Sequence, residues 1–195
     1  MGAGRDDVTG PDYRPEFLAA LDLLAKACSI VQAQGGRLPV LVGGAVVEIE
    51  TTSAVTTGDF DLLGGSEALM ADALVSVGFR REVRSGRKLG GFFHAELPIG
   101  IEFVSGGYFD GRGDRSRIRL LDRPGGTIPV AAVEDLIADR MGQWEASDRR
   151  DQARFTQAAL LLDLASDIDD AYLDRRIIEE TAGAASLATL RDQDP

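Results

Sequence analysis

The chain has 195 residues, of which 44% are hydrophobic, so it can bury the core of one domain and still carry a small helical appendage. Its formal net charge of −11 disfavours nucleic-acid binding except at a local basic patch. Its single cysteine excludes an internal disulfide, and no apolar run approaches the roughly 20 residues that span a bilayer, so we expect a cytoplasmic protein without a membrane partner.

The front of the chain is expected to alternate helices and strands. Residues 1–14 are polar and rich in Gly and Asp, which indicates a flexible arm. Apolar residues at helical spacing, with Pro15 in the first turn, predict a helix that ends at Gly35 and Gly36. The next expected elements are a buried strand at 38–42, a short helix at 45–49, a polar connection at 51–58 and a strand at 59–63.

The rest of the chain is expected to pass from mixed structure to helices alone. We expect a helix at 66–78, strands at 79–83, 88–97, 99–104, 118–121 and 128–130, and helices at 133–144, 148–163 and about 171–180. Residues 181–195 indicate a flexible tail. This order is typical of the α/β (α+β) class, with a mixed β-sheet core flanked by helices at 15–130 and a C-terminal helical region at 131–180.

Two acidic residues alternate with large apolar residues in the segment Asp59-Phe60-Asp61-Leu62-Leu63. Because the side chains of a strand alternate between its faces, Asp59 and Asp61 point to one face, roughly 6.5–7 Å apart along the strand. Carboxylates between apolar residues are costly to desolvate unless a cation meets them. The pattern favours a metal site over the alternative, a capping or turn role at an edge strand.

Glu102 lies between Ile101 and Phe103 in a later expected strand, on the face opposite to them. It is either a third carboxylate beside Asp59 and Asp61 or an exposed residue at the edge of a one-sided sheet. Three carboxylates close together stay ionised only beside cations, so the first interpretation requires metal, and Mg²⁺ prefers oxygen ligands.

A pair of glycines, Gly43 and Gly44, separates the apolar strand at 38–42 from the short helix that follows it. Such a turn lets a phosphate approach the backbone closely. A tight turn without a ligand explains the pair equally well. The position of the pair, shortly before Asp59 and Asp61, is what favours the first explanation.

Other side chains carry less specific signals. His94 is the only histidine, which excludes a Ser-His-Asp or Cys-His arrangement, and Trp144 is expected to pack between helices. A basic cluster is either a solvated rim or a contact for phosphate or polynucleotide; it comprises Arg80, Arg81, Arg84, Arg87 and Lys88.

Taken in order, Gly43-Gly44, Asp59-Phe60-Asp61 and Glu102 resemble the pattern of the nucleotidyltransferase superfamily with a DNA polymerase beta-like core. More narrowly, Gly-Gly-Ala followed by Thr-x-Asp-x-Asp-Leu, which begins at Thr57, is similar to minimal nucleotidyltransferases that include AbiE-type toxins. The stretch 134–137, Glu-Asp-Leu-Ile, followed by Arg140 resembles a helical motif of such proteins. The resemblance covers about residues 38–163.

The chain also departs from that family pattern. Arg140 stands where Lys is usual, and the third acid is Glu102 where Asp is commoner. The basic residue that often comes just before the Thr is missing, because Val55 and Thr56 occupy that stretch.

The resemblance implies a magnesium-dependent nucleotidyltransferase that moves an NMP from an NTP to an acceptor hydroxyl on RNA, protein or a small molecule. Asp59, Asp61 and Glu102 would be the catalytic residues and the ligands of two Mg²⁺ ions, with Mn²⁺ as a substitute. The residues implied to bind the nucleotide are Gly43, Gly44, Thr57 and Arg140.

The resemblance further implies one specialised role, a toxin of a toxin–antitoxin system with an antitoxin partner, and for some members action on tRNA 3′ ends. The alternative is a catalytically silent module of the same fold that binds a nucleotide or a protein.

Overall fold

The computed structural model describes residues 5–7, 12–82 and 91–192. The chain divides into two compact units, the first made of residues 1–107 and 115–131 and the second of residues 108–114 and 132–195. The described strands all belong to the first unit, whereas the second is helical.

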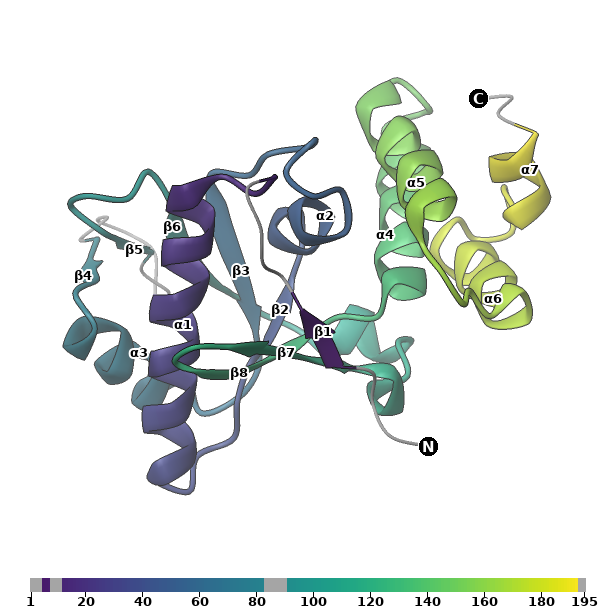
Figure 1. Ribbon diagram of the computed structural model, residues 1–195. Coiled ribbons are helices and arrows are strands. Elements are labelled where there is room, and N and C mark those ends of the chain that lie inside the picture. The colour runs from purple at the N-terminus through teal and green to yellow at the C-terminus, as the bar shows by residue number, and fades with distance from the viewer. Residues whose placement is uncertain (1–4, 8–11, 83–90, 193–195) are drawn as a thin grey trace. The chain divides into compact units, whose positions relative to one another are not determined.

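The strands of the first unit form one eight-stranded mixed sheet (Figure 1). Their bounds are Arg5–Asp7 (β1), Val40–Val42 (β2), Asp59–Leu63 (β3), Arg80–Arg81 (β4), Phe92–Phe93 (β5), Gly100–Val104 (β6), Arg119–Arg123 (β7) and Gly126–Val130 (β8). The order across the sheet is β1-β7-β8-β2-β3-β6-β5-β4. The pairs β1–β7, β2–β8 and β3–β6 are parallel and the other pairs are antiparallel, which confirms the predicted mixed sheet.

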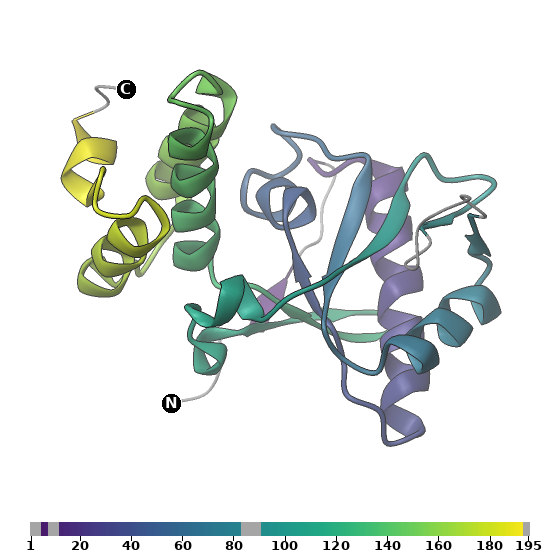
Figure 2. The ribbon, with the colours of Figure 1, turned by 180° about the vertical axis from the view of Figure 1, so that it is seen from behind.

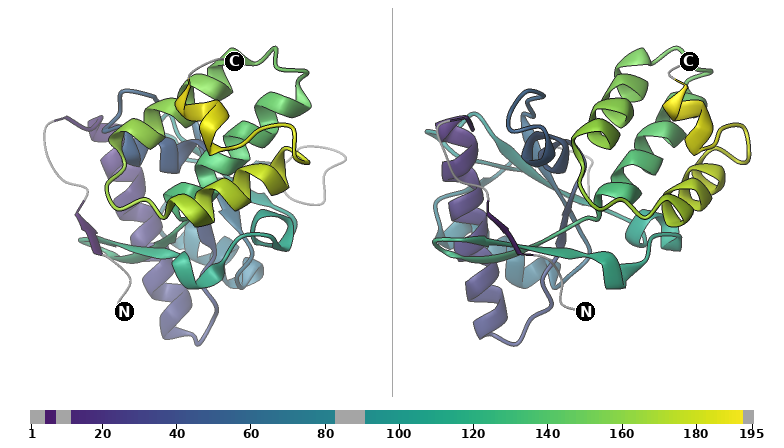
Figure 3. Two further views of the ribbon diagram at one scale, coloured as in Figure 1. Left: turned by 90° about the vertical axis from the view of Figure 1, so that its right-hand side faces the viewer. Right: turned by 45° about the vertical axis from the view of Figure 1, so that its right-hand side comes forward.

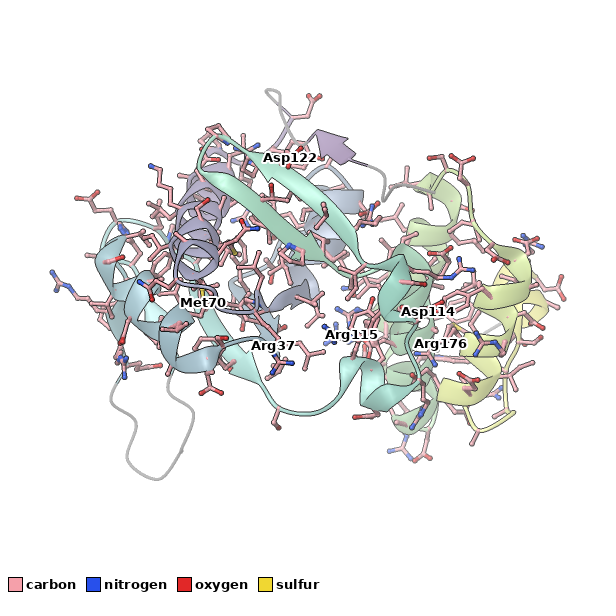
Figure 4. The ribbon with its side chains drawn as sticks, turned by 90° about the horizontal axis from the view of Figure 1, so that it is seen from below. Arg37, Met70, Asp114, Arg115, Asp122 and Arg176 are labelled. Atoms are coloured by element: carbon pink, nitrogen blue, oxygen red, sulfur yellow. The ribbon has the colours of Figure 1, made fainter. Side chains whose placement is uncertain are left out.

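Helix α1 (Pro15–Ala33) covers one face of the sheet, in front of it in Figure 1 and behind it in Figure 2. It packs against β8 and against α3 (Glu67–Ser76), where Figure 4 shows the buried Met70. Phe17 of α1 meets Phe60 of β3 edge to face, with ring centroids 5.5 Å apart. Because Phe60 points toward α1, its neighbours Asp59 and Asp61 point to the opposite face.

The second unit is a group of helices whose largest members lie side by side in Figure 3. The helices are α4 (Val133–Ala146), α5 (Gln152–Leu164), α6 (Asp170–Glu180) and α7 (Leu187–Arg191). Trp144 of α4 is fully buried and lies 4.9 Å from Phe155 of α5, as its spacing predicted. Among the described residues, every helix is too short or too polar to cross a bilayer.

The two expected flexible ends are partly ordered. Residues 5–7, placed in a loose arm, form β1 and pair in parallel with β7, more than a hundred residues further along the chain. In the expected tail, a capping box formed by Ser186 and Thr189 starts α7. Neither the remote pairing nor so short a helix produces a recognisable period in the sequence.

Residues 108–114 belong to the second unit, although they fall inside the expected core at 15–130. The hydroxyl of Tyr108 accepts a hydrogen bond from the amide of Ala132 at 3.1 Å, and the amide of Asp114 donates to the hydroxyl of Tyr172 at 2.9 Å. These contacts join residues up to 58 positions apart, so the sequence pattern did not reveal them.

Candidate functional site

Two of the predicted carboxylates lie side by side on neighbouring strands. In the parallel register of β3 and β6, Asp61 is directly opposite Glu102, and such strands are about 4.8 Å apart. Their neighbours Phe60 and Ile101 are also paired, and both are fully buried. Asp61 and Glu102 are half-buried on the face away from α1, so the structure brings these two acids together.

Asp59 differs from Asp61 in its exposure and in its partner on β6. It is exposed at the start of β3, and its partner in the register is Gly100, which has no side chain. The hydroxyl of Thr57 donates to the carboxylate of Asp59 at 3.3 Å and lies 3.0 Å from its carbonyl oxygen. Asp59 is therefore tied to the connection that precedes it.

The three acids are not gathered around a single point. Within residues 5–7, 12–82 and 91–192, no group of three or more His, Cys, Asp or Glu side chains is arranged to hold a metal ion. The donor chemistry nevertheless suits Mg²⁺, since all three side chains offer carboxylate oxygens on one face of two adjacent strands.

The predicted Gly-Gly turn lies against these residues, between β2 and α2 (Gly44–Glu50). Gly43 has φ +69°, and a Cβ atom there would be 2.3 Å from Oδ2 of Asp61. A Cβ atom on Gly44 would be 2.6 Å from Oγ1 of Thr57. Only glycine allows this approach at both positions, so the turn and both side chains form one compact site.

Gly91 lies near Glu102 and near a further acid, Glu82. A Cβ atom on Gly91 would be 3.7 Å from Oε1 of Glu102 and 3.4 Å from Oε2 of Glu82. Glu82 therefore adds acidic charge near Glu102. It was not among the predicted residues, because a single acid beside a basic cluster has no distinctive pattern.

Two further charged residues beside the site were not predicted. Glu48 of α2 is fully buried, and Arg14 donates to both of its carboxylate oxygens, at 2.8 and 2.7 Å. The hydrogen bonds with Glu48 raise the pKa of Arg14 above its usual value. A glutamate inside the apolar run Ala-Val-Val-Glu-Ile was the available signal, because a buried charge requires a partner.

Arg140, the predicted contact for the nucleotide, belongs to α4 in the second unit. One of its guanidinium nitrogens donates to the carboxylate of Asp139 at 2.8 Å. Burial raises the pKa of Asp139, against the opposing effect of the Arg140 charge. The role of Arg140 toward a nucleotide stays a prediction.

Most of the predicted basic cluster cannot be placed, because Arg84, Arg87 and Lys88 lie outside the described residues. Arg81 on β4 pairs with Asp72 at 2.9 Å, and its guanidinium carbon lies 5.8 Å from the ring centre of Phe92. These contacts are those of an exposed sheet edge, and they do not test the phosphate interpretation.

A hollow of about 400 Å³ lies within the second unit. Five of its seven lining residues are apolar, and the other two are an acid and a base: Ala159, Leu162, Asp163, Ala165, Ile168, Leu190 and Arg191. It lacks the paired carboxylates of β3 and β6, Asp61 and Glu102, which remain the candidate site.

Comparison with known proteins supports the fold. No model of a protein family matches the chain, and no curated protein matches it. The crystal structure of an antigenic nucleotidyltransferase-like protein from Paracoccidioides brasiliensis is similar, with a TM-score of 0.60 and 12% sequence identity over 92% of this chain and 94% of that chain. The chain therefore has a nucleotidyltransferase-like fold, and at this identity the likeness extends to the fold alone.

Proposed function

We propose that the protein is a magnesium-dependent nucleotidyltransferase, which moves an NMP from an NTP to an acceptor hydroxyl. The observation that carries the proposal is the register of β3 and β6, which pairs Asp61 with Glu102 next to Gly43. Two acids paired side by side offer oxygen ligands to a divalent cation, so the arrangement favours a function that uses one.

In this proposal each predicted residue has a separate task. Asp59, Asp61 and Glu102 offer oxygen ligands to Mg²⁺, and the bond with Thr57 engages one carboxylate oxygen of Asp59, Oδ1. The bound ions would neutralise charge on the entering and leaving oxygens. Gly43 and Gly44 leave room for a phosphate against the backbone.

The proposed reaction is a substitution at the α-phosphorus of the NTP. Glu102 accepts the proton of the acceptor hydroxyl, whose oxygen forms the new bond to the α-phosphorus. The bond from that phosphorus to the oxygen that bridges to the β-phosphorus breaks. Pyrophosphate leaves with the bridging oxygen, and the NMP remains on the acceptor.

Replacing Asp61 by Asn tests the proposal at its central residue. The exchange keeps the size of the side chain but removes the charge, so we expect Asp61→Asn, like Asp59→Asn, to abolish pyrophosphate release while the chain remains folded by circular dichroism. Asp72→Asn is the matched control, because Asp72 is an exposed acid of the same unit that pairs with Arg81 on β4. Nucleotide transfer at the wild-type rate by Asp61→Asn would rule out the assignment.

One observation favours a second candidate, a catalytically silent module that binds a nucleotide. The described acids are not gathered around one point, and Asp59 is bonded to Thr57. Calorimetry with an NTP and Mg²⁺, followed by an assay of pyrophosphate release, distinguishes the two candidates. Binding without release with every acceptor would favour the module.

The acceptor and the biological role complete the proposal. Two segments resemble minimal nucleotidyltransferases that include AbiE-type toxins: Gly43-Gly44-Ala45 and the stretch from Thr57 to Leu62. This resemblance supports a cytoplasmic toxin with an antitoxin partner. The net charge of −11 favours a protein or a small molecule over RNA as acceptor, unless basic residues gather near Glu102. The identity of the labelled fraction in a transfer assay decides between these acceptors.

A further inference from the structure

We propose that Arg14 and Glu48 are positioning residues, which together hold Thr57 and thereby the direction of Asp59. This inference rests on the proposed function, since it assigns the pair a purpose at the same site. Neither residue contacts Asp59 in a bond that the structure shows; they act through the connection at 51–58.

The first step is the burial of a charge. Glu48 has no exposed surface, and four donors satisfy its two carboxylate oxygens. Nε and Nη2 of Arg14 form a two-pronged contact at 2.8 and 2.7 Å. The hydroxyl of Ser53 donates at 2.9 Å and the amide of Thr57 at 2.7 Å. Half of the donors to this buried acid therefore come from the connection itself.

The second step is that the same ion pair holds both polar backbone groups of Thr57. Its amide donates to Glu48 at 2.7 Å, and its carbonyl accepts from Nη2 of Arg14 at 2.9 Å. A peptide segment that is bonded on both sides to charged groups, one of them fully buried, has little freedom to rotate. Arg14, which directly precedes α1, therefore helps to fix Thr57 in place.

The backbone conformation of the connection at 51–58 also indicates that contacts with other residues hold it. Thr52 and Ser53 have φ values of +49° and +60°, which residues other than glycine rarely adopt. Such a conformation persists where surrounding contacts impose it. Ser53 has such contacts, because its hydroxyl accepts from the amide of Arg14 at 3.2 Å and donates to Glu48.

The third step links Thr57 to the acids. Its hydroxyl is bonded to the carboxylate and the carbonyl of Asp59, and it lies where a Cβ atom on Gly44 would collide with it. Movement of Thr57 would therefore change the rotamer of Asp59 and the fit of the Gly-Gly turn. No residue of the connection at 51–58 is basic, so Arg14 supplies the guanidinium from another part of the chain.

Arg14→Lys is the informative variant, because it keeps the positive charge but cannot reach both oxygens of Glu48 and the carbonyl of Thr57. Arg123→Lys is the matched control. Arg123 is on β7 and pairs with Asp22 of α1 at 2.7 Å. Two strands, β8 and β2, separate β7 from β3, so this pair is remote from the site. Glu48→Gln is the second variant, which preserves the shape of the acid.

Two measurements on the full chain test the inference. Amide hydrogen exchange of the metal-free protein reports whether the amide of Thr57 stays hydrogen-bonded. Calorimetric titration with Mn²⁺ reports the metal affinity of the site. We expect Arg14→Lys and Glu48→Gln to lose protection at Thr57 and to weaken Mn²⁺ binding about 10–100-fold. Arg123→Lys should keep both properties.

The outcomes separate this inference from the function on which it rests. If Arg14→Lys exposes the Thr57 amide but binds Mn²⁺ as wild type does, or if the amide stays protected, the positioning role is wrong. If Asp61→Asn also leaves Mn²⁺ affinity unchanged, the proposed metal site is wrong as well. Loss of affinity in Asp61→Asn but not in Arg14→Lys contradicts the positioning role alone.

Discussion

Two features of Gly43 exclude a larger residue: its positive φ and its closeness to Asp61. Its φ of +69° is strained for any other residue, and an added Cβ atom would be 2.3 Å from Oδ2 of Asp61. We expect Gly43→Ala to destabilise the protein by about 1–3 kcal/mol and to abolish transfer, because Asp61 must move. Thermal unfolding and a transfer assay measure the two effects.

Two other glycines separate these effects. Gly64 also has a positive φ, +70°, but an added Cβ atom would meet nothing within 4 Å, so Gly64→Ala should lose stability and keep activity. Gly58, next to Asp59, has open space and no positive φ, so Gly58→Ala should keep both. Full transfer activity in Gly43→Ala would contradict the close contact with Asp61.

Cys28 is predicted to be inert in the folded protein. Burial raises the pKa of its thiol from 9.0 to about 12, so at pH 8 about one molecule in ten thousand carries the reactive thiolate. We expect a thiol reagent to modify Cys28 at pH 8 only after denaturation, measured by absorbance. A native protein that reacts as fast as the denatured one would show that α1 does not bury this residue.

The sign of the pH effect follows from the same shift. Between pH 9 and about 12 the folded protein keeps the thiol proton while the unfolded chain loses it. The contribution of Cys28 to stability is therefore fully present below pH 9 and falls as the pH rises through that window.

At the scale of elements, a buried ion pair joins α4 to α6. Asp135 and Arg176 have no exposed surface, and Nε of Arg176 donates to Asp135 at 2.8 Å (Arg176 is labelled in Figure 4). Burial acts to lower the pKa of Arg176, but hydrogen bonds with Asp135 and Glu180 outweigh it and raise the pKa. The guanidinium therefore stays charged inside the helical unit.

Removing one member of this pair should be costly. We expect Arg176→Met to lower the free energy of unfolding by about 3–5 kcal/mol, because it leaves Asp135 charged and buried. Arg175→Met, one residue away in an exposed pair with Glu179, should cost less than about 1 kcal/mol. Urea unfolding of both variants checks the difference, and equal losses would contradict the role of the buried pair.

At the scale of the whole molecule, local patterns predicted the elements better than their partners. The strand at 59–63 and the helix from 15 were expected within a residue or so, because alternation and helical spacing are local signals. The pairing of β1 with β7 and the contact of Arg14 with Glu48 join distant residues, so no period reveals them.

The candidate site shows the same division. Asp61, Glu102 and Gly43 were expected because acids and glycines at those spacings match a known pattern, and the register of β3 and β6 brings the two acids together. The direction of Asp59 depends on its bond to Thr57, which a motif does not specify. Side-chain rotamers are decided by packing, so spacing alone left the gathering of three acids open.

Transfer of labelled nucleotide tests the central claim most directly. The full chain is incubated with each NTP labelled at the α-phosphorus, Mg²⁺, and cell RNA or cell protein, with Asp61→Asn and a sample containing EDTA as controls. We predict that one acceptor fraction becomes labelled as pyrophosphate is released, and that both controls lose the label. Label that persists in Asp61→Asn, or no label with any NTP and acceptor, would contradict nucleotidyl transfer at this site.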